Sequence, residues 1–316
     1  MKIIKFFILI LILTVSINVA YASNLTVESQ NQTYEEDKKL ITLDKEVNVT
    51  IDDIKVMSPK AFLTINAQGK PDTATFVDGA KAIQVTKNST SETKANILKL
   101  SLIKKEVEAT GDVVSTMQKL GKPTVTIKSD YQSYNTNSNI MNVKDNVILT
   151  YGDVKATANS AKIWISKQNG FELLKLIGNA KVTQEQITVT GSEVDLDART
   201  EIMTANGNAF TNIVNDNTNI RIWAAHQEYN NKSNTAIASG SVKIKYDTYV
   251  ATGPKAVMIA DPKTQKPDKI IFSGRSKIVD GAKSIEADKI VITAMPKSFK
   301  ADGNVKTEIK DLSNLE

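Results

Sequence analysis

The chain lacks cysteine and has a single histidine, His226, among its 316 residues. Without cysteine there can be no disulfide framework, no acyl-cysteine membrane anchor and no thiolate metal site. One histidine cannot form a metal cluster, so we expect His226 to be a solvent-facing or hydrogen-bonded side chain. The HExxH, GxSxG, P-loop and GxGxxG motifs are also missing. The sequence therefore predicts no catalytic residues, no metal ligands and no cofactor.

Only one stretch is long and apolar, from Phe6 to Ala20, and it follows two lysines at the start of the chain. It is shorter than the roughly 20 apolar residues that a helix needs to cross a bilayer. The triplet Ala20-Tyr21-Ala22 has the small-x-small pattern of a signal peptidase site. We therefore expect residues 1–22 to be a signal peptide, cleaved after Ala22, and residues 23–316 to be periplasmic. An uncleaved anchor is the alternative.

Charge is nearly balanced. The formal net charge of the chain is +5, and removal of Lys2 and Lys5 with the signal peptide would lower it to +3. The lysines are spread along the chain and form no basic cluster in the sequence. Nucleic acid is therefore not an expected partner, because a nucleic-acid-binding surface concentrates positive charge on one face.

A short motif recurs along almost the whole chain: the end of one strand, a Gly or another turn-forming residue, a polar residue, and an alternating apolar strand. Its turn position falls at nine residues, separated by 29 to 34 residues, namely 45, 79, 111, 145, 178, 207, 240, 274 and 303. A fixed period of this length indicates a repeat architecture. Each period of about 32 residues should hold one rung of a stack.

Between these positions lies a second alternating strand, such as VKATANSAKIWI at 154–165 or ITVTGSEVDLD at 187–197. Apolar residues at every second position predict strands with one buried face, and Val, Ile, Thr and Tyr favour this structure. No window shows the 3.6-residue period of an amphipathic helix. The sequence predicts an all-β protein of about nine two-strand rungs, with a bend in the longer strand of each rung, arranged as an elongated open trough.

A longer period accompanies the short one. NLTVESQNQTY at 24–34 aligns with TVTIKSDYQSY at 124–134 and NIRIWAAHQEY at 219–229. We interpret these segments as the starts of three internal repeats within one jellyroll region, beginning near residues 24, 124 and 219. The alternative is that the segments look alike only because each belongs to a similar hairpin.

Alternate residues of a strand point to opposite faces of the sheet. The residues on the face that carries the apolar side chains should therefore point into the trough. They are expected to be ordinary core, and an open trough would also make them available to lipid. These candidate lipid-binding residues are Val125, Ile127, Val147, Leu149, Ile163, Ile165, Ile187, Val189, Ile220, Ile222, Val242 and Ile244.

The two ends of such a stack are unpaired strands. The first is expected at Leu25–Gln30 and the last at Val305–Ile309, and neither contains proline. These edges could accept a strand from another protein or from a second copy of this chain. Protection of the last edge by Lys306, Glu308 and Lys310 is the alternative.

Paired carboxylates give the best enzyme hypothesis. Asp195 and Asp197, or Glu286 and Asp288, are two residues apart and so share one face of a strand. Glycoside hydrolases use such pairs. Here they have outward parity and no neighbouring cluster of titratable residues, so solvated strand faces are the favoured interpretation, and we expect the protein not to be an enzyme.

One recurring pattern resembles that of a known family. It consists of a small residue before Asp or Asn in one strand and a Gly-Asn pair in the next strand. The matching residues are Ser129-Asp130, Ala158-Asn159 and Ala287-Asp288, with Gly178-Asn179-Ala180, Gly207-Asn208-Ala209 and Gly303-Asn304-Val305. Together with the signal peptide, this pattern resembles the OstA-like family, the LptA-type periplasmic proteins of lipopolysaccharide transport, over nearly all of residues 24–310. The chain is longer than the usual single-jellyroll carrier and richer in Asn and Lys.

The resemblance implies a twisted β-jellyroll, open along one side, that binds the acyl chains of lipopolysaccharide or a related glycolipid. It also implies that edge strands pair with homologous jellyroll proteins and that lipid passes toward the outer membrane. Two alternatives stay open: a membrane-tethered clamp of the same pathway, and a cell-surface structural or adhesive β-stack whose interior is sealed by side chains.

Overall fold

A computed structural model describes residues 25–51, 53–166, 170–215, 218–246, 248–261, 267–293 and 298–310. The expected signal peptide, residues 1–22, lies outside these ranges. Within them every helix or strand is a β-strand, and the 22 strands belong to one antiparallel sheet. The predicted all-β class is therefore confirmed. No helix of the described residues has the length and hydropathy needed to cross a membrane.

The described chain divides into two compact units that meet at residues 176 and 177, inside β13. The strands of the first unit are β1 Leu25–Glu28, β2 Asn31–Glu35, β3 Leu40–Ile51, β4 Ile54–Ile65, β5 Pro71–Val77, β6 Ala80–Val85, β7 Ser89–Ala95, β8 Ile97–Ser101, β9 Glu106–Lys119, β10 Val125–Asn135, β11 Ile140–Tyr151 and β12 Val154–Ser166. The strand at the boundary and those of the second unit are β13 Gly170–Gln184, β14 Ile187–Asp197, β15 Ile202–Asn215, β16 Thr218–Asn230, β17 Thr235–Tyr246, β18 Tyr249–Ala260, β19 Pro267–Asp280, β20 Lys283–Thr293, β21 Ser298–Asp302 and β22 Lys306–Ile309.

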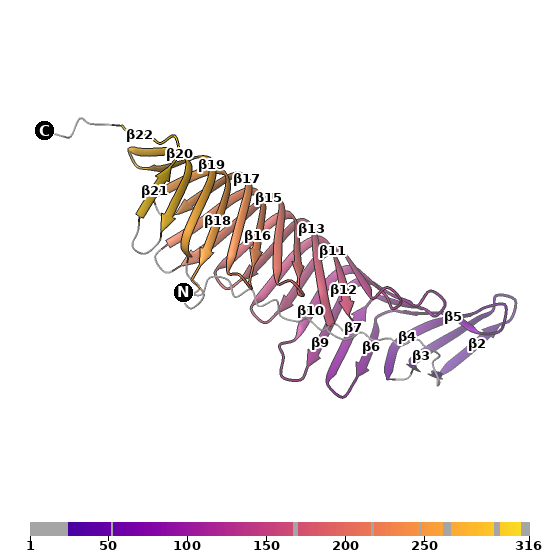
Figure 1. The fold of residues 1–316 in the computed structure, drawn as a ribbon. Helices are drawn as coiled ribbons and strands as arrows, with labels where there is room; N and C mark the ends of the chain where they lie inside the picture. The colour runs from indigo at the N-terminus through magenta and orange to yellow at the C-terminus, as the bar shows by residue number, and fades with distance from the viewer. Residues whose placement is uncertain are drawn as a thin grey trace. The chain divides into compact units, whose positions relative to one another are not determined.

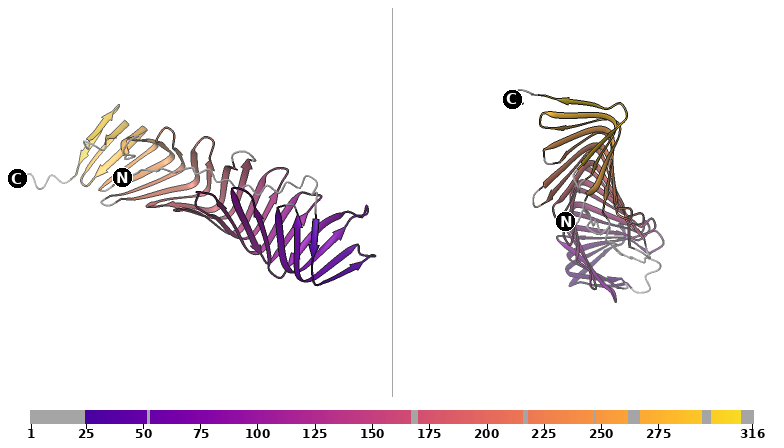
Figure 2. Two further views of the ribbon diagram at one scale, coloured as in Figure 1. Left: turned by 90° about the horizontal axis from the view of Figure 1, so that it is seen from below. Right: turned by 60° about the vertical axis from the view of Figure 1, so that its left-hand side comes forward.

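Strands pair as antiparallel neighbours within each unit. In the first unit the pairs that are not consecutive in the chain are β1–β3, β4–β6, β5–β8 and β7–β9. In the second unit β14 pairs with β15, and the ladder continues strand by strand to β20, which pairs with both β21 and β22. Figure 1 shows these strands side by side in chain order, from reddish pink through orange to yellow, and Figure 2 shows the same order from two other directions. Their alternating Val, Ile and Thr residues explain this choice of structure, because β-branched side chains fit a pleated, half-buried surface.

The nine recurring positions were expected to be turns, and this prediction is wrong for most of them. Seven lie inside long strands, as Gly111 does in β9 and Gly207 in β15. At Gly207-Asn208 both residues have positive φ, 69° and 54°, and the strand register with β16 shifts there. Such a pair forms a bulge opposite a single residue of the next strand, so the strand bends and continues. Only positions 79 and 303 fall between separate short strands.

The bend occurs in both strands of a rung, and not only in the longer one. In β10 it lies at Asp130, between the register pairs Ser129–Val113 and Tyr131–Thr110 of β9. The Asn146 amide of β11 donates to Asp130 Oδ2 over 2.8 Å, so the bulges of neighbouring strands contact each other. Each long strand therefore has two arms that meet at a corner.

Two observations favour glycine at the corner formed by residue 207. Gly207 has the left-handed φ that residues with a side chain rarely adopt. A Cβ at this position would also lie 2.5 Å from Ser192 Oγ and 2.7 Å from Ser192 Cβ. The serine hydroxyl donates to the Gly207 carbonyl over 3.1 Å, so β14 and β15 approach closely at the corner.

Candidate functional site

The twelve predicted apolar residues are all buried, each with at most 8% of its surface exposed. The parity argument therefore placed them on the inner face of the strands. Burial alone does not distinguish ordinary core from lipid-binding residues, so their role in binding stays a prediction.

Cross-strand pairing joins these residues into stripes that run across the strands. In the second unit Ile187 pairs with Ile213, Ile213 with Ile220, Ile220 with Tyr246, and Tyr246 with Tyr249. In the first unit Val125 of β10 pairs with Met117 on one side and Tyr151 on the other. Side chains opposite each other on neighbouring strands have Cβ atoms about 5 Å apart. Each of these two stripes is thus a continuous row of apolar and aromatic side chains across neighbouring strands.

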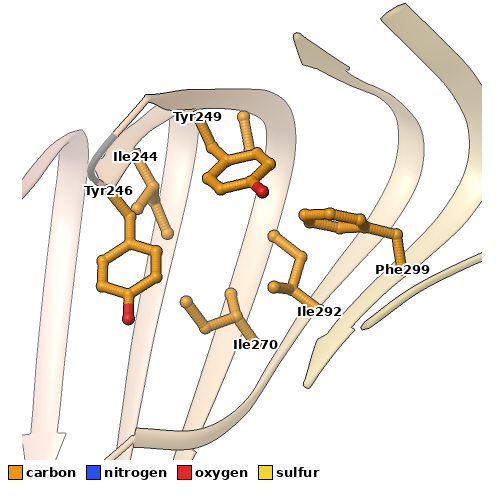
Figure 3. A pocket seen from close by; sticks show the side chains of 7 residues that line it. Ile244, Tyr246, Tyr249, Ile270, Ile292 and Phe299 are labelled. Atoms are coloured by element: carbon orange, nitrogen blue, oxygen red, sulfur yellow. The ribbon is translucent and has the colours of Figure 1, made fainter. Parts of the chain in front are cut away.

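The stripe through Tyr246 and Tyr249 leads to an apolar pocket near the last strands. Figure 3 shows Tyr249, Ile292 and Phe299 converging on one space, with Ile244, Tyr246 and Ile270 beside it. The Tyr249 and Phe299 rings have centroids 4.9 Å apart and are tilted by 47°. Tyr246 and Tyr249 belong to one set of arms, whereas Ile270, Ile292 and Phe299 belong to the other. The two inner faces therefore meet at this pocket.

The pocket is narrow. Its cavity volume of about 10 Å³ for water-sized spheres corresponds to about one water molecule. A second pocket of the same volume lies between Ile222, Tyr229, Ile237 and Met258, and Ile244 lines both pockets. Side chains thus fill most of these two spaces, and an acyl chain could enter either of them only if the two arms separated or these side chains moved.

A polar cluster lies in this otherwise apolar interior. Gln227 is 1% exposed, and its amide nitrogen donates to the carbonyls of Ala209 at 2.9 Å and Ile222 at 3.2 Å. Its amide oxygen accepts from the hydroxyls of Thr211, over 2.6 Å, and Tyr229. Burial raises the pKa of Tyr229, and the Thr211 hydroxyl opposes the shift. Every polar atom of the Gln227 amide is therefore hydrogen-bonded, as buried polar groups require.

The first unit contains an equivalent glutamine. Gln132 is 3% exposed, donates to the Ile127 carbonyl at 3.2 Å and accepts from Ser115 Oγ at 2.6 Å. Sequence analysis missed these residues as part of the interior because only apolar side chains were assigned to it. The signal was present, since both glutamines occupy the same column of the aligned repeat segments.

Three of the four carboxylates considered for catalysis, Asp197, Glu286 and Asp288, are engaged in a turn or in ion pairs. Asp197 Oδ1 accepts from the backbone nitrogens of Arg199 at 2.8 Å and Thr200 at 3.2 Å. Partial burial alone would raise the pKa of Asp197, but these hydrogen bonds and the Arg199 guanidinium lower it below its ordinary value. A carboxyl with a lowered pKa is a poor general acid near neutral pH.

The second pair is similar. Glu286 Oε1 accepts from Lys277 Nζ at 2.9 Å, and this hydrogen bond lowers the pKa of Glu286. Asp288 accepts from the Asn304 amide at 2.7 Å and lies 3.7 Å from Arg275. His226 Nδ1 lies 2.6 Å from the amide oxygen of Asn206. Across the described part of the chain, no three His, Cys, Asp or Glu side chains are grouped as a metal site would require.

Comparison with known proteins gives a family match for the central part of the chain. Residues 126–220 match the family described as LptA/(LptD N-terminal domain) LPS transport protein. This match spans β10 to β15 and part of β16. No curated protein sequence matches the chain.

Among solved structures, one match is the crystal structure of LptH from Pseudomonas aeruginosa, described as the LptA homologous periplasmic component of the lipopolysaccharide transport device. It is 12% identical, with a TM-score of 0.36, and the alignment covers 41% of this chain and 95% of LptH. Over residues 126–220, the chain is therefore similar to the LptA/LptD N-terminal domain family of LPS transport proteins.

Proposed function

We propose that this chain is a non-catalytic periplasmic carrier that binds the acyl chains of lipopolysaccharide or a related glycolipid and passes it toward the outer membrane. Residues 1–22 would direct export and be removed. The observation that carries the proposal is the continuous apolar inner face, which ends in the pocket around Tyr246, Tyr249 and Phe299. The family of residues 126–220 supports lipopolysaccharide as the first cargo to test.

The physical basis of binding would be the removal of acyl chains from water. Each CH₂ group kept from water contributes about 0.8 kcal/mol. The aligned stripes offer such groups a path across several strands, and the sugar portion would stay outside. Because the pocket has a cavity volume of only about 10 Å³, binding requires the arms to move apart, as expected for a carrier that must also release its cargo.

Carrying lipid between membranes needs partners at both ends. The first and last strands offer backbone groups that could pair with homologous jellyroll proteins or with another copy of this chain. This part of the proposal is independent of which glycolipid is bound.

Site-specific photo-crosslinking tests the cargo. A photoreactive residue replaces Ile163 or Ile222, which are 0% and 4% exposed, and the matched controls are their outward-facing neighbours Lys162 and Arg221. Ultraviolet irradiation of cells should attach glycolipid at the inward positions, as seen by mass spectrometry of the purified protein. Attachment only at Lys162 or Arg221 would overturn the proposal. Circular dichroism establishes that each variant remains folded.

The small volume of these two pockets favours one other function, a cell-surface structural or adhesive β-stack. That function predicts no lipid in the purified protein and cleavage by protease added to intact cells. A membrane-tethered clamp of the same pathway would instead retain Met1 on the mature protein. The mass of the intact protein, with and without extracted lipid, distinguishes these outcomes.

A further inference from the structure

The first unit contains an open row of hydrogen bonds across three strands. Thr93 Oγ1 of β7 lies 3.0 Å from Ser115 Oγ of β9, and Ser115 donates to Gln132 Oε1 of β10 over 2.6 Å. Gln132 is buried, whereas Thr93 and Ser115 are half-buried. We call these three side chains the hydroxyl relay, and its Thr93 end has access to solvent.

The relay lies on the same face as the predicted lipid-binding residues. Thr93 is the register partner of Ser115, and Ser115 is the register partner of Ile127. Opposite residues of neighbouring strands point to the same side of a sheet. Ile127 is 1% exposed and belongs to the inner apolar set. The relay therefore places hydrogen-bonding atoms on a surface that is otherwise suited to acyl chains.

The second unit has the same contact in a closed form. Thr211 donates to Gln227 there, as Ser115 donates to Gln132 in the first unit. The Tyr229 hydroxyl contacts both Thr211 Oγ1 and Gln227 Oε1, which completes a ring of three oxygens. Thr211 is 0% exposed. A ligand could reach that ring only by displacing buried side chains.

Two differences open the relay of the first unit. Tyr134 occupies the place of Tyr229 in the aligned repeats, but its hydroxyl donates to Asn139 Oδ1 over 3.2 Å. Thr93 occupies the place of Val189, because each is the register partner of the hydroxyl residue in its unit. The relay thus ends in a half-buried hydroxyl where the second unit has a buried apolar side chain.

The glutamine fixes the direction of the hydrogen bonds in the relay. An amide oxygen can only accept, and the Gln132 nitrogen donates to the Ile127 carbonyl, so the Ser115 proton points to Gln132 Oε1. The Ser115 oxygen is then the acceptor in its contact with Thr93, and Thr93 supplies the proton. The lone pairs of Thr93 Oγ1 are left at the accessible end. That end accepts hydrogen bonds and has no proton to donate.

We propose that the relay is a recognition site for a hydroxyl group carried on an acyl chain. The ligand hydroxyl donates to Thr93 Oγ1, while the rest of the chain packs on the apolar residues of the same face. A carbonyl oxygen at that place meets only lone pairs and loses its hydrogen bonds with water. The inference rests on the proposed function, since it states which acyl chains the carrier prefers.

Three fatty acids of equal length test this preference: 12-hydroxyoctadecanoate, 12-oxooctadecanoate and octadecanoate. The first carries a donor, the second carries only an acceptor at the same carbon, and the third carries neither. Calorimetric titration of the purified protein, below the concentration at which the probes form micelles, gives the dissociation constants. We expect the hydroxy probe to bind about five- to tenfold more tightly than the oxo probe, which corresponds to one buried hydrogen bond.

Thr93→Val removes the acceptor and reproduces the valine found at Val189 of the second unit. The hydroxy and oxo probes should then bind almost equally. Thr116→Val is the matched control, because Thr116 is the neighbour of Ser115 in β9 and points to the opposite face. This control should keep the preference of the unchanged protein. Circular dichroism establishes that each variant remains folded.

Ser115→Ala tests the direction of the relay. Without the serine oxygen, the Thr93 proton is free to be donated to a ligand. The oxo probe should therefore bind more tightly to Ser115→Ala than to the unchanged protein, and the difference between the two probes should decrease. Equal weakening of both probes would show that Ser115 has only a structural role and would overturn the proposed direction.

The three probes also separate this inference from the carrier proposal. Equal binding of all three by the unchanged protein, or a preference that persists in Thr93→Val, would overturn the hydroxyl site and leave the carrier proposal standing, since acyl chains are still bound. Failure of all three probes to bind would overturn both.

Discussion

Thr211 of β15 donates a hydrogen bond to Gln227 of β16 across 2.6 Å in the buried interior. The glutamine also accepts a hydrogen bond from the Tyr229 hydroxyl, and it donates hydrogen bonds to two backbone carbonyls. Replacing it with an apolar residue of similar size would leave these groups buried without their partner. An unsatisfied buried group costs about 1–3 kcal/mol.

Gln227→Leu should therefore lower the free energy of unfolding by about 2–4 kcal/mol, since more than one group loses its partner. Urea unfolding followed by circular dichroism measures the change. Gln68→Leu, at an exposed turn position, is the control and should change stability by less than about 0.5 kcal/mol. Similar losses in both variants would show that the buried network contributes little.

We expect the burial of Tyr229 to cause a loss of stability at alkaline pH. Burial raises the pKa of its hydroxyl above the ordinary value of 10.0. The neutral form is thus favoured in the folded state, so the contribution of Tyr229 to stability is constant below the ordinary pKa of 10.0 and decreases as pH rises toward the folded pKa. One linked proton corresponds to a slope of about 1.4 kcal/mol per pH unit.

Tyr229→Phe should make this alkaline slope shallower, although it loses the hydrogen bond to Gln227 at every pH. The measurement is the unfolding free energy from pH 8 to pH 11. Tyr34→Phe, which changes an exposed tyrosine, should leave the slope unchanged. A slope that stays the same in Tyr229→Phe would contradict the effect.

We expect Asp197 to cause a loss of stability at acidic pH. Its lowered pKa means that the carboxylate stabilises the turn above the ordinary pKa of 3.8, and that this contribution is lost as pH falls through the folded value. Asp197→Ala should lower stability by about 1 kcal/mol at pH 7. Asp197→Asn should retain most of it, because an amide oxygen can still accept from Arg199 and Thr200, and should remove the acid dependence. Urea unfolding at pH 3 and pH 7 tests both variants, and equal losses in them would contradict the turn role.

The sequence predicted the strands and their buried faces because alternation has a direct physical cause. A side chain such as Ile163 or Val189 is either on the inner or the outer face, and the apolar set selects the inner one. The corner was misassigned because Gly-Asn with positive φ serves both hairpin turns and bulges. Whether the pair forms a turn or a bulge depends on the neighbouring strand, and the local sequence carries no information about that strand.

The interior was predicted only in part for a similar reason. Gln227 is polar, and nothing in its own strand indicates that Thr211, Tyr229 and two carbonyls surround it. The pocket residue Phe299 comes from a short strand near the end of the chain. Its place follows from pairing with β20, a contact that becomes visible only in three dimensions.

The corner glycines allow strain and steric contact to be separated. Gly207 and Gly69 both have left-handed φ values, 69° and 74°. A Cβ at Gly69 would meet open space, whereas a Cβ at Gly207 would lie 2.5 Å from Ser192 Oγ. Gly69→Ala should therefore cost only the backbone term, about 1 kcal/mol. Gly207→Ala should cost about 2–4 kcal/mol, because the corner must also move.

A double-mutant cycle isolates the contact with Ser192. In a Ser192→Gly background the side chain that a Cβ at position 207 would meet is gone, so Gly207→Ala should there cost nearly as little as Gly69→Ala. The coupling energy between positions 192 and 207 should be at least about 1 kcal/mol in urea unfolding. No coupling, with Gly207→Ala as costly in both backgrounds, would mean that backbone strain alone requires glycine at this corner. Equal and small costs at Gly69 and Gly207 would mean that β14 and β15 relax to admit the methyl group.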